Sequence, residues 1–495
     1  MRTLLLSLLL ASGATGALAN NIFIDNVLLG DQNVNSGTRT VTFDVQWENS
    51  WRVADSPGNH DAAWVFLKFH RADGLWHHAL LTTGTPGGAG SSIDVTADGI
   101  GAFVYRTDYG ISPTIRHNAM QIEWDYRSSG IADDEPVAIE IFAIEVVYVP
   151  ANDFYLGSGG GSTSITTPLS EFFTRGSLTF APYRIQSEAA ISLSPLSGDV
   201  SVVGLNLSGS IPAAFPKGHQ GFYCMKYEVS QQQYVKFFNR QTATEQGLLD
   251  LAGLGTLCST LSLNRNSFCW DGSGEAVTEH PFVPVSYLTV NQILAYLDWT
   301  GLRPMTELEY EKVCRGPAAP TKNDYPWGTD KIATGNYTVT SADGNTEQIS
   351  NPDPADPAAG NALYLGTQLR ISLDPLQGPL RNGALAASKS GSTRLTSGGG
   401  YYGVMELAGN LREFVVSATT PAGQSFAGEH GDGELTDDGL QFLLDWPLSG
   451  LGYGGRGGDY TSLAPELQIS NRIHTAAGIT VGELQGFRGV RTFTN

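Results

Sequence analysis

The four cysteines are the residues with the most definite chemistry in this sequence: Cys224, Cys258, Cys269 and Cys314. Four cysteines allow three disulfide pairings. We favour a Cys258–Cys269 bond, which closes a short polar loop containing two asparagines, together with a Cys224–Cys314 bond. A zinc site is the alternative, but there is no C-x-x-C motif and no histidine pair near these cysteines. We therefore expect two disulfide bonds.

An acidic, glycine-rich segment is the second candidate for chemistry. It covers residues 429–434, which read EHGDGE, and Asp437 and Asp438 follow closely. It is not an EF-hand calcium loop, because the twelfth position counted from Asp432 is Leu443 rather than glutamate. We expect a polar surface loop, with cation binding as the alternative.

The amino-acid composition limits the classes of molecule that this protein could bind. The chain of 495 residues has 29 lysines and arginines and 49 aspartates and glutamates, so its net charge is −20. A nucleic-acid partner requires a basic face, so none is expected. The 59 glycines and 24 prolines predict a protein rich in strands and loops rather than a helical bundle.

The N-terminus predicts export from the cytoplasm. Arg2 precedes an apolar run over residues 4–10, and small residues end at Ala19. This order is typical of a secretory signal peptide, here residues 1–19, and the apolar run is too short to cross a bilayer. We expect a secreted protein, extracellular, periplasmic or associated with the cell surface, without a membrane span after signal cleavage.

Two units are expected to position the chemistry. Residues 20–145 alternate apolar and polar side chains between turn-forming clusters, which predicts an all-β sandwich domain. Residues 146–495 form the second unit, where three helices are predicted. One helix begins after Ser230, one spans residues 289–300, and one begins with a capping box at Thr306.

Eight segments of the second unit follow one another in a recognisable order. They are residues 147–150 with 154–157, then 227–238, 284–287, 302–310, 325–328, 402–414, 456–458 and 486–491. Residues 402–414 read YGVMELAGNLREF, and residues 486–491 read GFRGVR. In this order the segments resemble the formylglycine-generating enzyme, or sulfatase-modifying factor, family. The resemblance implies an α+β, C-type-lectin-like fold for residues 146–495, with long loops held by metal ions.

The resemblance also implies what catalysis would need. Active members of the family resemble copper oxidases that convert a substrate cysteine into formylglycine. Their copper is held by two cysteine thiolates shortly after the segment matching residues 456–458, and thiolates are the ligands that Cu(I) prefers. This chain has no cysteine after Cys314. We therefore expect no copper and no catalytic residues. Iron-dependent sulfoxide synthases also carry this domain, but they add a helical domain that this strand-rich N-terminal part does not offer.

Two structural calcium sites are carried over from the family, residue by residue. The first would use the carboxylates of Glu406 and Glu413 and the carbonyl groups of Gly409 and Leu411. The second would use Asn336, the carbonyl group of Tyr337, Asp374 and the carbonyl group of Leu376. Oxygen ligands from a tight loop are those that Ca²⁺ requires. The alternative for the first site is that the two glutamates are simply solvated.

These expectations lead to one functional hypothesis and two alternatives. The hypothesis is a secreted pseudoenzyme of this family that binds an extracellular protein or glycan. The first alternative is a formylglycine-generating oxidase that modifies a protein cysteine. The second is a structural component of an extracellular appendage or matrix, which the acidic and weakly charged composition allows.

Overall fold

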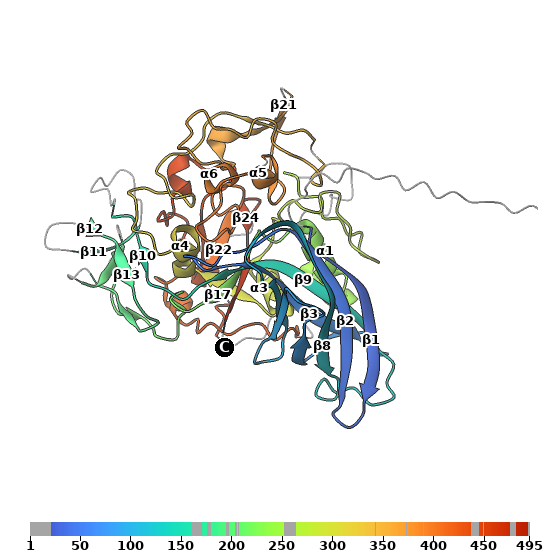
Figure 1. Ribbon diagram of the computed structural model, residues 1–495. Coiled ribbons are helices and arrows are strands. Elements are labelled where there is room, and N and C mark those ends of the chain that lie inside the picture. The colour runs from blue at the N-terminus through green and yellow to red at the C-terminus, as the bar shows by residue number, and fades with distance from the viewer. Residues whose placement is uncertain are drawn as a thin grey trace, which may run out of the picture.

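The computed structural model of the protein describes most of the chain (Figure 1). The described residues are 21–159, 171–175, 180–194, 198–202, 205, 207–251, 264–341, 343–372, 374–389, 391–436, 445–448, 450–475 and 482–493. The expected signal peptide and Cys258 lie outside these residues. The described chain is strand-rich with few helices, as expected for an α+β protein. None of its helices has the length and apolar character needed to cross a membrane.

An eleven-stranded sheet runs through both halves of the chain. Nine strands follow the order β23-β22-β18-β25-β17-β9-β3-β7-β6, while β24 pairs with β22 and β4 with β3. In chain order they are β3 (Asp61–His70), β4 (Trp76–His78), β6 (Ser91–Val95), β7 (Ala102–Arg106), β9 (Ala138–Val149), β17 (Phe222–Met225), β18 (Arg303–Thr306), β22 (Arg412–Val416), β23 (Tyr453–Arg456), β24 (Gln485–Gly486) and β25 (Gly489–Thr492).

Strand β9 joins the two halves of this sheet. It pairs with β3 from Ala138 to Val147 and with β17 from Val146 to Val149. The expected domain boundary between residues 145 and 146 therefore falls inside one strand. The reason is that one uninterrupted strand, rich in β-branched and aromatic residues, serves both neighbours.

A second sheet packs against the β3 and β9 end of the first. Its order is β1-β2-β8-β5, and the strands are β1 (Phe23–Asn33), β2 (Thr38–Arg52), β5 (Leu81–Thr85) and β8 (Gly110–Asp125). Val41 and Phe43 of β2 share a hydrophobic core with Val65 of β3 and Ile141 of β9. This is the core that the alternation of the N-terminal sequence favours.

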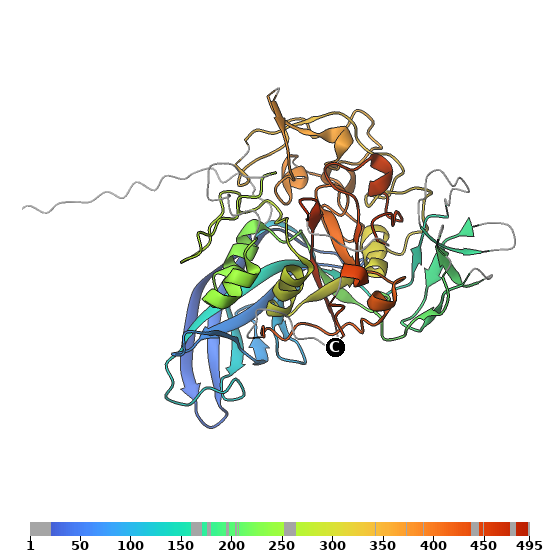
Figure 2. The same cartoon turned by 180° about the vertical axis from the view of Figure 1, so that it is seen from behind.

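Helices cover the opposite face of β3 and β9, as the view from behind shows (Figure 2). The α-helices are α1 (Gln231–Phe238), α2 (Ala243–Leu249), α3 (Val290–Trp299), α4 (Glu307–Arg315), α5 (Ala384–Ala387), α6 (Arg394–Ser397) and α7 (Pro421–Gln424). Trp64, Phe66 and Phe142 of the sheet pack with Phe237 of α1 and Trp299 of α3 in one core. Strand β3 is thus buried on both faces.

The three helices expected from sequence are confirmed. Ser230, Thr289 and Thr306 cap α1, α3 and α4, and each forms a complete capping box with the residue three positions later. In each box the cap side chain accepts a hydrogen bond from a backbone N–H group that the helix leaves free.

The remaining elements are short. They are β10 (Phe154–Leu156), β11 (Phe172–Arg175), β12 (Phe180–Ala181), β13 (Tyr183–Ile185), β14 (Ile191–Ser192), β15 (Val200–Val202), β16 (Ser210–Ile211), β19 (Tyr337–Thr338), β20 (Leu369–Ile371) and β21 (Asp374–Leu376), with 3₁₀ turns η1 (Leu365–Thr367), η2 (Gly450–Gly452) and η3 (Ala464–Leu467). Long loops connect them.

Two cysteines differ from the expectation. Cys224 of β17 and Cys314 of α4 are free thiols, so the expected Cys224–Cys314 disulfide is wrong. Both are fully buried in one hydrophobic cluster, and burial raises the pKa of Cys224 to about 12. They therefore serve as small apolar core residues. Cys269 is disulfide-bonded. Its expected partner, Cys258, is outside the described residues, so that pairing stays a prediction.

Candidate functional site

The first expected calcium loop has a curled backbone that leads into β22. Glu406, Gly409 and Asn410 have positive φ angles of 50°, 75° and 63°. A Cβ atom at Gly409 would lie 2.1 Å from the carbonyl oxygen of Leu363. Glycine is therefore required there by both conformation and space.

Three buried carboxylates lie near enough to one another around this loop to interact electrostatically. Glu406 and Glu413 belong to the expected site, and Glu228 comes from the segment before α1. Each carboxylate has one bonded oxygen: Glu406 Oε1 accepts from the N–H of Gly383 at 2.9 Å, Glu228 Oε2 from the amide of Asn410 at 2.7 Å, and Glu413 Oε1 from Nε of Arg488 at 2.8 Å.

The other oxygen of each carboxylate is buried without a hydrogen-bond partner among the described residues. These oxygens are Oε1 of Glu228, Oε2 of Glu406 and Oε2 of Glu413. Orphaned buried carboxylate oxygens are costly, so such a group takes up a proton or a cation.

The pKa shifts of the three glutamates also indicate that these carboxylates take up a proton or a cation. Burial raises the pKa of Glu406 to about 7, although the charges of Arg488 and Arg381 oppose the rise. Burial and mutual repulsion also raise the pKa of Glu228, and burial raises that of Glu413. Arg488 is the cation that forms an ion pair with Glu413. The cluster is therefore short of positive charge.

The donor chemistry of this cluster fits a calcium ion. All its free atoms are oxygens, which Ca²⁺ prefers. Among the described residues, no three acidic, histidine or cysteine side chains are placed to hold one ion together. The expected carbonyl groups of Gly409 and Leu411 would therefore have to complete the shell. Sequence reasoning missed Glu228, although it lies in residues 227–238, one of the eight matching segments.

The second expected calcium site is not assembled in this way. Strand β20 lies between β19 and β21, so that Tyr337 and Leu376 both pair with Leu369. Two strand spacings separate them by roughly 10 Å. The amide oxygen of Asn336, in the orientation that satisfies its neighbours, accepts hydrogen bonds from the guanidinium of Arg370. Asp374 lies on β21, and its side chain is outside the described residues. The site stays a prediction that this geometry does not favour.

The loop after β23 follows residues 456–458, the segment after which the resemblance places the family's copper thiolates. The hydroxyl of Ser462 lies 3.1 Å from Oδ2 of Asp459 and 3.2 Å from Oε2 of Glu466. Nε2 of His474 lies 2.8 Å from the same Glu466 oxygen. Because serine and histidine both contact the glutamate rather than each other, this is not a nucleophile–base arrangement. Oxygen and imidazole donors do not replace two thiolates, so the residues present do not fit a Cu(I) site.

The acidic segment 429–434 is anchored rather than free. The ammonium of Lys68 donates to the carbonyl oxygen of Gly433, and the N–H of His78 donates to Glu434. The N–H of Asp432 donates to Oδ1 of Asp298 at 3.1 Å. The cation beside this loop is thus a lysine from β3, and the loop ties the C-terminal half to the N-terminal strands. Asp437 and Asp438 lie outside the described residues.

Comparisons with known proteins agree with the resemblance. Residues 206–493 match the family described as sulfatase-modifying factor enzyme 1-like domain. A formylglycine-generating enzyme from Thermomonospora curvata is 34% identical over 67 residues, which is 14% of this chain and 22% of that protein. The chain thus matches about a fifth of the length of this curated relative.

Proposed function

The chain belongs to the sulfatase-modifying factor family, and we propose that it is a secreted member that has lost copper-dependent oxidation and acts as an extracellular binding protein. One observation carries the proposal: no cysteine follows Cys314, so the C-terminal loops contain no thiolate for a soft metal. The two free cysteines among the described residues cannot substitute, because both are fully buried. The activity in the name of the T. curvata relative is therefore not carried over to this chain.

The binding surface in this proposal is a set of loops on a C-type-lectin-like scaffold. The signal peptide expected at residues 1–19 supports an extracellular setting. The glutamate cluster supports calcium as a structural ion held by Glu406 and Glu413, with Glu228 beside them. When bound, calcium would neutralise buried carboxylates and stiffen the loop before β22. The expected N-terminal sandwich would serve as a second module on the shared sheet.

The decisive experiment is an oxidation assay. The mature protein is loaded with Cu(I) and incubated with a cysteine peptide of the sulfatase type, with the T. curvata enzyme as the positive control. We expect neither an aldehyde product nor oxygen consumption by this protein. Aldehyde formation at a rate comparable to the control would overturn the proposal and favour the oxidase alternative.

Binding itself is tested on a glycan array and by native mass measurement. Capture of a defined glycan by a monomer agrees with a binding protein. Spontaneous growth into large regular assemblies, without ligand capture, would favour the structural alternative instead.

A further inference from the structure

Strand β9 has one edge along which only part of the strand is paired with a neighbouring strand. Along its length it pairs with β3, but on the other side β17 pairs only with its last four residues, Val146–Val149. In the described structure no strand is hydrogen-bonded to the outer edge of residues 139–144, although β1 packs nearby. Open edges of this kind are sites at which another chain can add a strand.

Hydrogen bonds at the end of β9 show which residues face the open edge. The N–H of Lys226 donates to the carbonyl oxygen of Glu145 on the β17 side, while the N–H of Tyr148 donates to His60 on the β3 side. Backbone groups alternate in direction along an antiparallel strand, and the β3–β9 pairing has no bulge. The odd-numbered residues Ile139, Ile141 and Ala143 therefore point their N–H and C=O groups outward.

These outward groups form no hydrogen bond with any described residue. They lie in a partly sheltered position, since Ile141 and its neighbour Phe142 are only 7% and 8% exposed. Backbone polar groups in such a position are normally paired. Three outward residues can accept a partner strand with up to about six hydrogen bonds.

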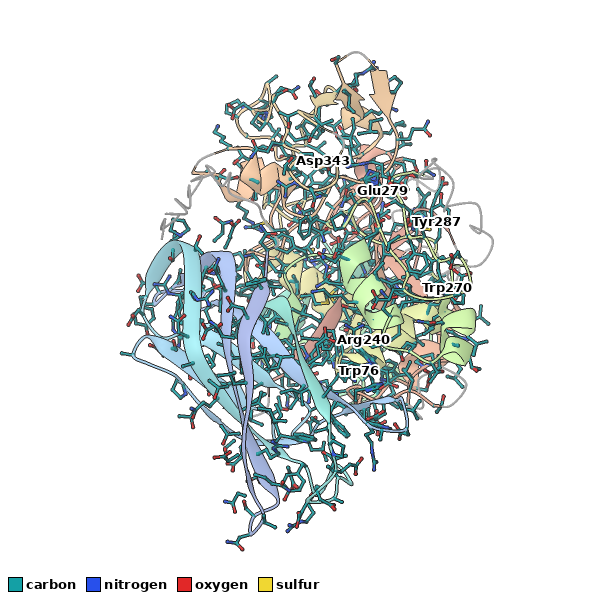
Figure 3. The ribbon with its side chains drawn as sticks, turned by 90° about the vertical axis from the view of Figure 1, so that its right-hand side faces the viewer. Trp76, Arg240, Trp270, Glu279, Tyr287 and Asp343 are labelled. Atoms are coloured by element: carbon teal, nitrogen blue, oxygen red, sulfur yellow. The ribbon has the colours of Figure 1, made fainter. Side chains whose placement is uncertain are left out.

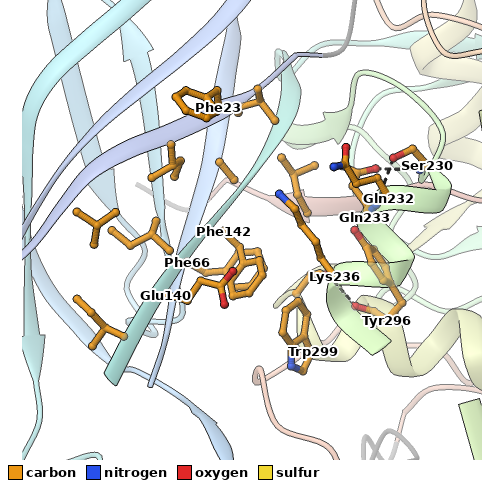
Figure 4. A pocket seen from close by; sticks show the side chains of 18 of the residues that line it. Phe23, Phe66, Glu140, Phe142, Ser230, Gln232, Gln233, Lys236, Tyr296 and Trp299 are labelled. Carbon is orange, nitrogen blue, oxygen red and sulfur yellow. Dashed lines mark hydrogen bonds between the residues drawn. The ribbon is translucent and has the colours of Figure 1, made fainter. Parts of the chain in front are cut away.

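The open edge lies in a groove with a cavity volume of about 310 Å³. Phe23, Ile24 and Val27 of β1 form one wall, α1 forms the other, and aromatic side chains that include Phe142 and Trp299 line the space between them (Figure 4). Apolar walls with a few polar groups are typical of binding grooves.

Two polar side chains of α1 line this groove, one turn apart. Gln232 and Lys236 have no side-chain hydrogen bond or ion pair among the described residues, and Figure 4 shows Lys236 extending into the space between α1 and β9. The acid in the groove, Glu140, is already bound by Arg240 at 2.6 Å, and Arg240 lies over the ring of Trp76 (Figure 3). The unpaired charge in the groove is therefore positive, although the chain as a whole carries −20.

We propose that this groove binds an extended peptide segment of a partner protein as an added β-strand along β9. The peptide presents apolar side chains to β1 and the aromatic base, and an acidic side chain to Lys236. Main-chain hydrogen bonds supply affinity in this mode, and the side-chain contacts supply selectivity. The contact from residue 139 to residue 143 is roughly 14 Å long at the usual rise of a strand.

A second copy of the chain is a poorer occupant than a peptide. The edge of β9 is recessed between β1 and α1, and the same strand of a second molecule would be recessed equally. The flanking elements of the two copies would therefore collide before the strands could pair. This inference goes beyond the proposed function and does not depend on it, because the copper question concerns the loop after β23.

The first test uses the mature wild-type protein and a library of blocked seven-residue peptides. The peptides alternate β-branched and variable residues around a central glutamate. Matched controls have the same side chains, with alternate backbone nitrogens methylated so that they cannot donate. We expect saturable binding by fluorescence anisotropy, weakened at least tenfold by methylation. Absence of binding by every member at millimolar concentration, or equal binding of methylated peptides, overturns the proposal.

Amide hydrogen exchange locates the bound peptide. The N–H groups of Ile139, Ile141 and Ala143 should exchange at least tenfold more slowly when the peptide is bound. Those of Phe142 and Ile144, which face β3, serve as internal controls and should change little. Protection confined to any other surface, or dimer formation through this edge in native mass measurements, contradicts peptide capture.

Two variants complete the test. Ala143→Pro removes one outward N–H group without removing a bond to β3, and should weaken binding at least tenfold, whereas Ala143→Val keeps the donor and should not. Lys236→Glu should reverse the preference, so that a central lysine replaces glutamate in the best peptides. Unchanged selectivity in Lys236→Glu refutes the charge assignment. If Ala143→Pro does not fold, the methylated peptides still decide the backbone claim.

Discussion

Two regions are held together by different forces: the N-terminal sheets, residues 21–149, and the C-terminal loops, which are here the described residues from 303 to 493 together with the short helices and strands that they connect. The N-terminal sheets bury long alternating strands in apolar cores. Ion pairs with both partners inside these sheets are partly exposed, as with Arg71 and Glu135. In the C-terminal loops, ion pairs such as Glu307 with Arg456 and Arg472 are fully buried.

The difference shows how a loop-rich fold provides hydrogen-bond partners for its backbone N–H and C=O groups. Paired strands bond their own N–H and C=O groups, so the space between sheets can be filled with apolar side chains. Loops and strand ends leave carbonyl groups with spare acceptor capacity, and buried arginines donate to them. Arg488 donates to the carbonyl oxygens of Met225, Lys226 and Met405 while it also pairs with Glu413. Guanidinium suits this task because it has five donors in a rigid plane.

The largest effect is expected from breaking a buried ion pair in the C-terminal loops. Glu307→Ala removes the shared partner of Arg456 and Arg472, and it should lower the free energy of unfolding by about 3–5 kcal/mol in urea titrations. The matched change in the N-terminal sheets, Glu135→Ala, should cost no more than about 1 kcal/mol. If both variants lose the same free energy of unfolding, ion pairs do not contribute differently to the two regions.

The next effect comes from the apolar core of the N-terminal sheets. Leu67 of β3 is fully buried between the two sheets. Leu67→Ala should therefore cost about 2–4 kcal/mol, from lost apolar burial and the cavity left behind. Urea unfolding measures this loss. A loss of less than about 1 kcal/mol in the free energy of unfolding would mean that the sheets relax around the cavity and that Leu67 is not closely packed.

The junction between the two regions should respond to pH. Burial lowers the pKa of Lys68 to about 7, despite the nearby carboxylates of Glu434, Asp298 and Asp432. Between pH 7 and about 10, Lys68 is more often protonated in the unfolded chain than in the folded one. The free energy of unfolding should therefore increase by about 3 kcal/mol over this pH range. Lys68→Met should lose this rise. The control is Lys389→Met, at an exposed lysine, which should keep the wild-type dependence of the free energy of unfolding on pH. If Lys68→Met also keeps the wild-type dependence, Lys68 is not the group responsible.

Calcium should stabilise the C-terminal loops and leave the N-terminal sheets unchanged. At one hundred times its dissociation constant, the ion should add about 2.7 kcal/mol to the free energy of unfolding. Hydrogen exchange should slow around residues 406–413 and not in β2 or β8. Glu406→Gln should abolish the gain, while Glu466→Gln, in the loop after β23, should retain it. Stabilisation that survives Glu406→Gln places calcium elsewhere.

Much of the fold was predictable because local patterns encode it. The caps at Ser230, Thr289 and Thr306 predict helix starts, since a capping box acts within one turn of chain. The alternation in residues 41–47 predicts a strand with one buried face, since its period is local too. The ordered segments from 147 to 491 were enough to predict the family, which the match over residues 206–493 confirms.

About half of the candidate site was predictable in the same way. Glu406 and Glu413 are visible in one short motif, and the structure places both beside the same buried Arg488. Glu228 is 178 positions before Glu406 in the chain, and no local signal shows that the two approach each other. Only folding brings it to the cluster, which explains why sequence reasoning missed it.

The sequence alone determined the absence of late thiols, the net charge, the helix starts and the alternating strands, because each depends on residue types or on spacing within a few positions. Tertiary structure decided which distant groups meet. It kept Cys224 and Cys314 as separate buried thiols, placed Lys68 beneath the acidic loop, and left the outer edge of β9 open. These outcomes depend on long-range packing, in which the relative position of whole sheets and loops, rather than any local pattern, sets the distances between side chains.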